Sequence, residues 1–184
     1  MKRLMSMEPW VILGALVVCA IVISGSECEA GRSYPAPVAQ TLPTPRFADN
    51  GNGTVTDNLT GLIWLKNANC FSAGQWSTAV MNAVFLATGA CGLTDGSQVG
   101  DWRLPGVEEL ESLLDYTYFN PSLSNAARTG RWTEGNPFTG VQLNGYWSLT
   151  TLVSYPGSAW VVYFTDGYVN ADDKMNTYYV WPVR

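Results

Sequence analysis

The chain has 184 residues, a formal net charge of −5 and 0 histidines. The acidic balance argues against nucleic acid as a partner. Without histidine, this sequence holds no Ser-His-Asp or Cys-His catalytic arrangement.

The first thirty residues, 1–30, are predicted to be a secretory signal peptide. A basic start precedes an apolar run at 11–23, and small residues follow up to Ala30. The run is shorter than the roughly 20 residues that span a bilayer, so a retained membrane anchor is the weaker alternative. Lipidation at Cys19 is another alternative. We expect an exported protein, periplasmic, on the cell surface or extracellular, that touches a membrane only through an uncleaved signal segment.

Residues 31–45 are predicted to form a proline-rich linker, and 46–184 to form one domain. The linker carries four prolines among few large apolar residues, which favours an extended spacer. The domain has the length of one ordinary folded unit and can bury a hydrophobic core.

The domain opens with a predicted hairpin, Phe47–Asp57, whose turn is rich in asparagine and glycine. A buried strand is expected next, at Leu62–Leu65. The acidic, asparagine-rich turn also suggests a calcium loop. With Asp49 as the first ligand, however, the third and fifth positions are Gly51 and Gly53, which offer no side-chain oxygen, so we favour the plain hairpin.

Cys70 and Cys91 are the cysteines that follow the predicted signal peptide and linker. In an exported protein such a pair normally forms a disulfide. A metal or redox role is the alternative, which the lack of histidine and the wide spacing disfavour.

Two helices are predicted between the hairpin and the later strands. Apolar residues recur at helical spacing over Trp76–Ala87, and Gly89 is expected to end that helix. The second helix is expected to start at Pro105. Glu108 and Glu109 then lie in its first turn, where they suit the helix dipole better than they suit paired acid and base catalysis.

The second half of the domain is predicted to be a long loop followed by strands. The loop runs from about 120 to 140, and strands are expected at 146–150, 159–164 and 178–184. Residues 170–174 are predicted to be an exposed loop. Early helices, late strands and no alternation of strand and helix indicate an α+β fold with antiparallel sheets.

Several motifs follow one another in the domain: Phe47–Asp57, Thr60–Trp64, Gly100–Pro105, Tyr146–Ser148, Ala159–Trp160 and Val180–Arg184. Together they resemble the Lcl C-terminal domain, a bacterial family. The resemblance implies a C-type-lectin-like fold with paired N- and C-terminal strands, two helices, a small second sheet and a long loop region that binds ligand. The cysteine pair also fits the family pattern.

For family members on collagen-like stalks, the resemblance implies adhesion, with sulfated glycans as one ligand class. This chain lacks the Gly-x-y repeat of such stalks. It also lacks the Glu-Pro-Asn, Gln-Pro-Asp and Trp-Asn-Asp tripeptides that supply calcium and sugar ligands in animal lectins. We therefore expect no cofactor, with Asp166, Asp172 and Asp173 as weak candidates for a hard cation such as calcium.

Trp102–Pro105 also resembles part of the formylglycine-generating enzymes, but those need a late cysteine pair, and no cysteine follows Cys91. We therefore expect the protein to have no enzymatic activity. The sequence instead favours an exported binding or adhesion module for an extracellular glycan or protein. A structural subunit that self-assembles through the 31–45 arm is the alternative. The proposed ligand-binding residues, to which Tyr163 and Tyr178 add aromatic faces, are Trp132, Asn136, Asp166, Tyr168, Asn170, Asp172, Asp173 and Asn176.

Overall fold

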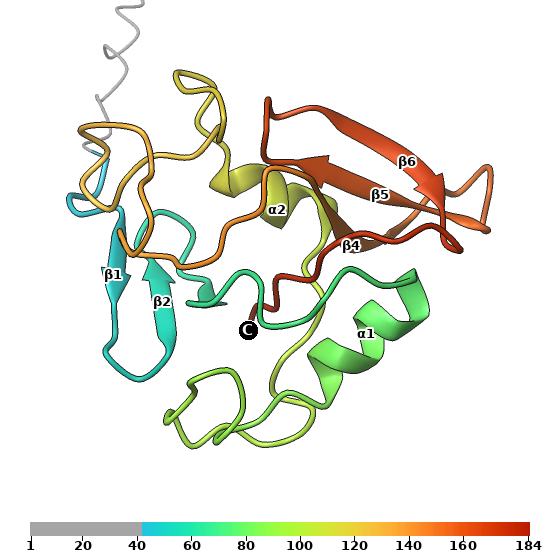
Figure 1. Cartoon of the computed structure of the whole chain (residues 1–184), viewed down its shortest axis with the longest axis horizontal. Helices are drawn as coiled ribbons and strands as arrows, with labels where there is room; N and C mark the ends of the chain where they lie inside the picture. Colours follow the sequence, from blue (N-terminus) through green and yellow to red (C-terminus); the bar gives the residue numbers. More distant parts are fainter. Residues whose placement is uncertain (1–41) are drawn as a thin grey trace, which may run out of the picture. The chain divides into compact units, whose positions relative to one another are not determined.

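A computed structural model describes residues 42–184 (Figure 1). The predicted signal peptide and most of the predicted linker lie outside the described residues. Over residues 42–184 the model contains no helix with the length and apolar character needed to cross a membrane.

The first sheet is antiparallel and has the order β1-β2-β3. Its strands are β1 (Phe47–Asp49), β2 (Thr54–Asp57) and β3 (Ile63–Leu65). In the turn between β1 and β2, Gly51 and Gly53 adopt positive φ angles of 73° and 85°, which glycine takes without steric cost. The predicted hairpin and the strand after it are confirmed.

The second sheet, also antiparallel, has the order β4-β5-β6. Its strands are β4 (Gly145–Thr151), β5 (Ser158–Tyr163) and β6 (Val169–Asp173). The prediction that 170–174 is an exposed loop was wrong, because all but the last of these residues belong to β6. Asn and Asp are poor strand formers, and here pairing along β5 overrides that preference.

The helices cover opposite faces of the second sheet. On one side, Leu110 and Leu113 of α2 (Val107–Leu113) share a buried cluster with Val162 of β5. On the other side, Ala79 and Ala83 of α1 (Trp76–Val84) pack with the neighbouring β5 residues and with Trp147. Both helices were predicted, but α1 ends three residues earlier and α2 begins two residues later than expected.

The first turn of α2 is fixed by Glu109. Its carboxylate accepts two hydrogen bonds of 2.6 Å from the Arg103 guanidinium and one of 2.7 Å from the Gly106 amide. These bonds hold the pKa of Glu109 below its ordinary value, chiefly through Arg103. Glu109 is therefore a helix-capping residue, and its carboxylate is already occupied.

Residues 178–184 join the two sheets instead of forming the last strand that the sequence predicts. Short bridges link Tyr179 to Tyr146 of β4 and Val183 to both Trp64 of β3 and Arg103. The segment forms no continuous strand, since it changes partner along its length. It bonds to β3 of the first sheet through single bridges, so the paired N- and C-terminal strands that the family resemblance implies are not formed as two continuous strands.

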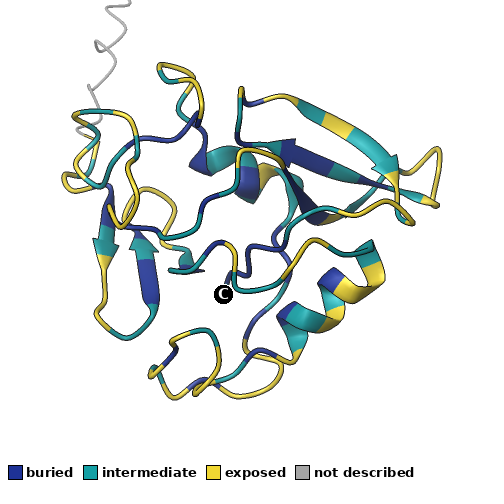
Figure 2. Ribbon diagram, viewed as in Figure 1, coloured by how far each residue is buried: buried dark blue, intermediate teal, exposed yellow. Residues whose placement is uncertain are grey.

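Large aromatic residues fill the core, and Figure 2 shows buried segments in both sheets, in both helices and near the C-terminus. The indole of Trp181 is fully buried, donates a 2.8 Å hydrogen bond to the Leu65 carbonyl and lies 4.9 Å from the Phe138 ring. A buried ion pair, Arg46 to Asp57 at 3.1 Å, closes one end of the first sheet. The model thus confirms an α+β fold, while the C-type-lectin-like assignment stays a prediction.

Candidate functional site

The register of the second sheet decides where each polar residue of β6 points. Directly opposed residues on antiparallel strands point to the same face. Asn170 lies opposite Val161 and Asp172 lies opposite Ala159. Both β5 residues are buried in the cluster that includes α1. Asn170 and Asp172 therefore project from the α1 side of the sheet, at its open edge.

Aromatic and amide side chains complete this surface, which we name the β6 face. The hydroxyl groups of Tyr163 and Tyr178 lie 3.0 Å apart, and the Tyr178 hydroxyl donates to the Asp172 carboxylate. The Asn176 amide donates to the same carboxylate at 2.9 Å. The β6 face consists of Tyr163, Tyr168, Asn170, Asp172, Asn176 and Tyr178.

The hydrogen bonds of the β6 face fix its charge as well as its shape. Hydrogen bonds from Tyr178 above all, and from the Asp173 amide and Asn176, hold the pKa of Asp172 below its ordinary value. Burial, together with its bonds to Asp172 and Tyr163, raises the pKa of Tyr178. Near neutral pH Asp172 is thus ionised and Tyr178 is neutral. The pair is suited to hydrogen bonding with a ligand and poorly suited to exchanging protons with one.

Tyr168 forms the rim of the face at the turn between β5 and β6. The residue is 59% exposed, and its ring centre lies 5.9 Å from that of Tyr163. Asp166 belongs to the same turn, where its carboxylate accepts a 2.9 Å hydrogen bond from the Tyr168 amide. Tyr116 packs closely against this turn, since a Cβ on Gly167 would lie 2.6 Å from Cε1 of Tyr116.

Lys174 closes the other end of the face. Its ammonium group lies 4.2 Å from the Trp76 ring centre and donates to the Thr151 hydroxyl and the Pro156 carbonyl, both at 2.9 Å. Asp173, one residue earlier, lies opposite Ser158 and so points to the α2 side of the sheet. Asp172 and Asp173 are therefore neighbours in sequence but lie on different surfaces.

Trp132 and Asn136 lie in the long loop and take part in its internal structure. The Trp132 indole donates a 3.2 Å hydrogen bond to the Phe138 carbonyl, and its ring packs against the core. The Asn136 side-chain oxygen accepts from the Ala126 amide at 3.3 Å. Figure 1 shows this loop near β1 and β2, with β6 on the other side of the molecule. Neither residue joins the β6 face.

The three aspartates that were weak cation candidates do not gather. Among residues 42–184 there is no group of three or more His, Cys, Asp or Glu side chains able to hold a metal ion. Asp172 and Asp173 point to opposite faces, and Asp166 lies in the turn at the far end of β6. A shared calcium site from these three residues is not supported by the geometry.

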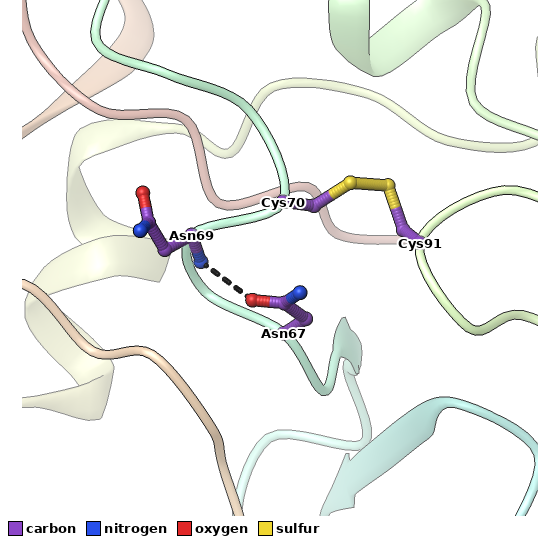
Figure 3. The surroundings of a disulfide bond; sticks show 4 residues. All are labelled: Asn67, Asn69, Cys70 and Cys91. Carbon is purple, nitrogen blue, oxygen red and sulfur yellow. Dashed lines mark hydrogen bonds between the residues drawn. A yellow bond between two sulfur atoms is a disulfide. The ribbon is translucent and has the colours of Figure 1, made fainter.

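The predicted disulfide is present between Cys70 and Cys91, with the Cα atoms 5.5 Å apart (Figure 3). Nearby, the Asn69 amide donates to the Asn67 side chain at 3.0 Å. An open hollow of about 430 Å³ lies beside the bridge, lined by Gly51, Gly53, Lys66, Asn67, Cys91, Gly92 and Thr139. The sequence analysis did not identify this hollow, and only the run of asparagines after β3 hinted at a polar surface there.

Of the eight residues proposed from sequence, the structure brings Tyr168, Asn170, Asp172 and Asn176 onto one face. Asp166 lies beside them in the turn. Sequence reasoning missed the contribution of Trp76 and Lys174, which no local motif signals, because helix α1 approaches β6 only in the folded domain.

Comparison with protein families shows that residues 53–184 match the Lcl C-terminal domain. The match covers both sheets from β2 onward, both helices and the whole β6 face. A comparison with curated proteins finds no match for this sequence.

Proposed function

The chain belongs to the Lcl C-terminal domain family, and we propose that it is an exported, non-catalytic binding or adhesion module. In this proposal the β6 face recognises an extracellular ligand, either a glycan or a protein. Adhesion is the role that the family resemblance implies for members on collagen-like stalks, and for this chain it stays part of the proposal.

The observation that carries the proposal is the pairing of an exposed ring with a fixed carboxylate. Tyr168 is 59% exposed, and Asp172 is held by three hydrogen-bond donors on the same face. Such groups lose little conformational freedom when they bind a ligand, which favours affinity. Aromatic side chains with polar tips are enriched at binding surfaces for this reason.

Export is supported by the disulfide between Cys70 and Cys91, since such bonds persist in oxidising compartments. The non-catalytic reading rests on the engagement of the acidic groups. Glu109 is bound to Arg103, and Asp57 is bound to buried Arg46. With 0 histidines in the sequence, the usual general base is missing as well.

The test is to probe the full chain on arrays of glycans and of extracellular proteins, with calcium and with a chelator. Asp172→Asn should weaken any saturable binding about tenfold or more, because it removes the charged acceptor at the centre of the face. Asp173→Asn is the matched control, since this neighbouring acid points to the other face. Equal loss in both variants, or no binding by either array, would count against the proposal.

A structural subunit of a surface assembly is the second candidate. The loop between β4 and β5 favours it, since Val153 is 93% exposed and Tyr155 is 72% exposed. Exposed apolar side chains of this kind can serve contacts between copies. Sedimentation over a range of concentrations distinguishes the two functions. Assembly that Val153→Ser abolishes would favour the subunit, and a monomer at all concentrations would favour the binding module.

A further inference from the structure

The β6 face offers two stacked tyrosine rings at the turn between β5 and β6. Tyr168, which is 59% exposed, stacks at a tilt on the partly buried Tyr163. The Tyr168 ring is thus fixed by packing on one side and open on the other. A flat apolar surface of one ring's width matches the C–H face of a single sugar ring better than it matches an extended hydrophobic partner.

Next to the rings, the face offers hydrogen-bonding groups of both kinds. The Asp172 carboxylate is an acceptor, and the exposed amides of Asn170 and Asn176 can donate and accept. Asn176 uses one amide hydrogen on Asp172 and keeps its carbonyl oxygen available. Sugar hydroxyl groups also donate and accept, and they surround a ring whose two faces carry C–H groups. The arrangement along β6 is therefore complementary to a saccharide.

The charges around the β6 face bear on the charge of the saccharide that it could bind. Asp166 and Asp172 are acidic. The ammonium group of Lys174, at the other end of the face, is held by Thr151, Pro156 and the Trp76 ring. A sulfate or carboxylate on a ligand beside Tyr168 and Asp172 would meet the like charge of these two carboxylates.

We infer that the β6 face binds an uncharged saccharide, with Tyr168 stacking on a sugar ring and Asp172, Asn170 and Asn176 bonding its hydroxyl groups, without a metal ion. This inference rests on the proposed binding function of the same face. It narrows the ligand to one chemical class and assigns the stacking role to Tyr168.

The experiment uses a printed array on which each oligosaccharide appears as a matched pair, uncharged and sulfated, beside a panel of extracellular proteins. The full chain should bind uncharged members, equally with calcium and with a chelator. Tyr168→Ala should lose about tenfold or more of that affinity, and Tyr168→Phe should keep most of it. Tyr155→Ala, which removes a still more exposed ring from the β4–β5 loop, is the control and should bind normally.

The outcomes separate this inference from the proposed function. If the protein prefers the sulfated members, or if binding vanishes with the chelator, the inference of an uncharged saccharide bound without metal is wrong. The proposed binding function would still stand. Binding only to a protein, lost in Tyr168→Ala, would have the same two consequences. Near-ultraviolet circular dichroism identifies any misfolded variant, and a folded protein that binds nothing on the array overturns both.

Discussion

Each of the two sheets holds an aspartate in a network of hydrogen bonds, but with opposite accessibility. In the first sheet, Asp57 is 0% exposed and is bound to Arg46, which is itself buried. In the second sheet, Asp172 lies at an open edge and is bound to Tyr178 and Asn176. The comparison teaches that the first network holds the domain together, whereas the second keeps a charged group ready at the surface.

The sharpest test of this difference is to remove the cation of the first network. Arg46→Met leaves Asp57 buried without its partner, and we expect a loss of about 3–5 kcal/mol in the free energy of unfolding. Urea denaturation measures it. The matched control is Lys66→Met, which breaks the partly exposed pair of Lys66 and Asp49 and should cost less than about 1 kcal/mol. Similar losses in the two variants would contradict the structural role of the buried pair.

The disulfide gives the next largest effect. Replacing Cys70 and Cys91 together by alanine should lower the free energy of unfolding by about 3 kcal/mol, because the bridge closes a loop of 21 residues. Urea denaturation with and without reductant measures this. The wild-type protein should weaken in reductant to the level of the double variant, which should not respond. A wild-type protein indifferent to reductant would show that the bridge contributes little.

The turn of the first sheet offers a matched pair of glycines. A Cβ on Gly53 would lie 2.4 Å from the Gly92 carbonyl oxygen, whereas one on Gly51 would meet nothing within 4 Å. Both residues have positive φ, so alanine strains both backbones alike. Gly53→Ala should therefore cost about 1–3 kcal/mol more than Gly51→Ala in thermal or urea unfolding. Equal costs would mean that the Gly53 turn does not pack on the disulfide loop.

The smallest effect concerns the second network. Tyr178→Phe removes the main donor to Asp172, so the pKa of Asp172 should rise toward its ordinary value of 3.8. With a depressed pKa, ionised Asp172 stabilises the fold above about pH 4, and this contribution disappears as pH falls through the folded pKa. The variant should lose at most about 1 kcal/mol at neutral pH.

Titration of the Asp172 carboxyl by NMR measures the shift. Tyr163→Phe is a graded control, because the Tyr163 hydroxyl contacts Tyr178 and reaches Asp172 only through it. The shift should be smaller there than in Tyr178→Phe. An unchanged pKa in Tyr178→Phe would show that the hydroxyl does not govern this carboxylate.

Local patterns predicted most of the fold. Turn glycines, helical spacing and β-branched residues located the first hairpin, both helices, β4 and β5. Local patterns failed where the conformation of a segment depends on the neighbouring strands with which it pairs. The polar residues of β6 extend because β5 offers them an antiparallel partner, and residues 178–184 do not form one strand because four different segments bond to them.

Composition indicated which segment contains the candidate site, but it did not indicate the face of the sheet to which each residue points. The mixture of tyrosine, asparagine and aspartate after β5 indicated the region that contains the β6 face. Only the pairing register separates Asp172 from Asp173, since a shift by one residue exchanges the two faces. For Trp132 and Asn136, exposure was inferred from a loop-rich sequence, but long loops need internal hydrogen bonds and these residues supply them.

Residues 178–184, which link the two sheets, also determine when the domain can complete its folding during synthesis. Ile63 exchanges backbone hydrogen bonds with Arg184, and Trp181 fills the core between the sheets. Until the ribosome has made this segment, β3 has a partner only on its β2 side and the core lacks the Trp181 indole. Contacts so distant along the chain form slowly. A nascent chain therefore completes its core only after residues 178–184 have been made.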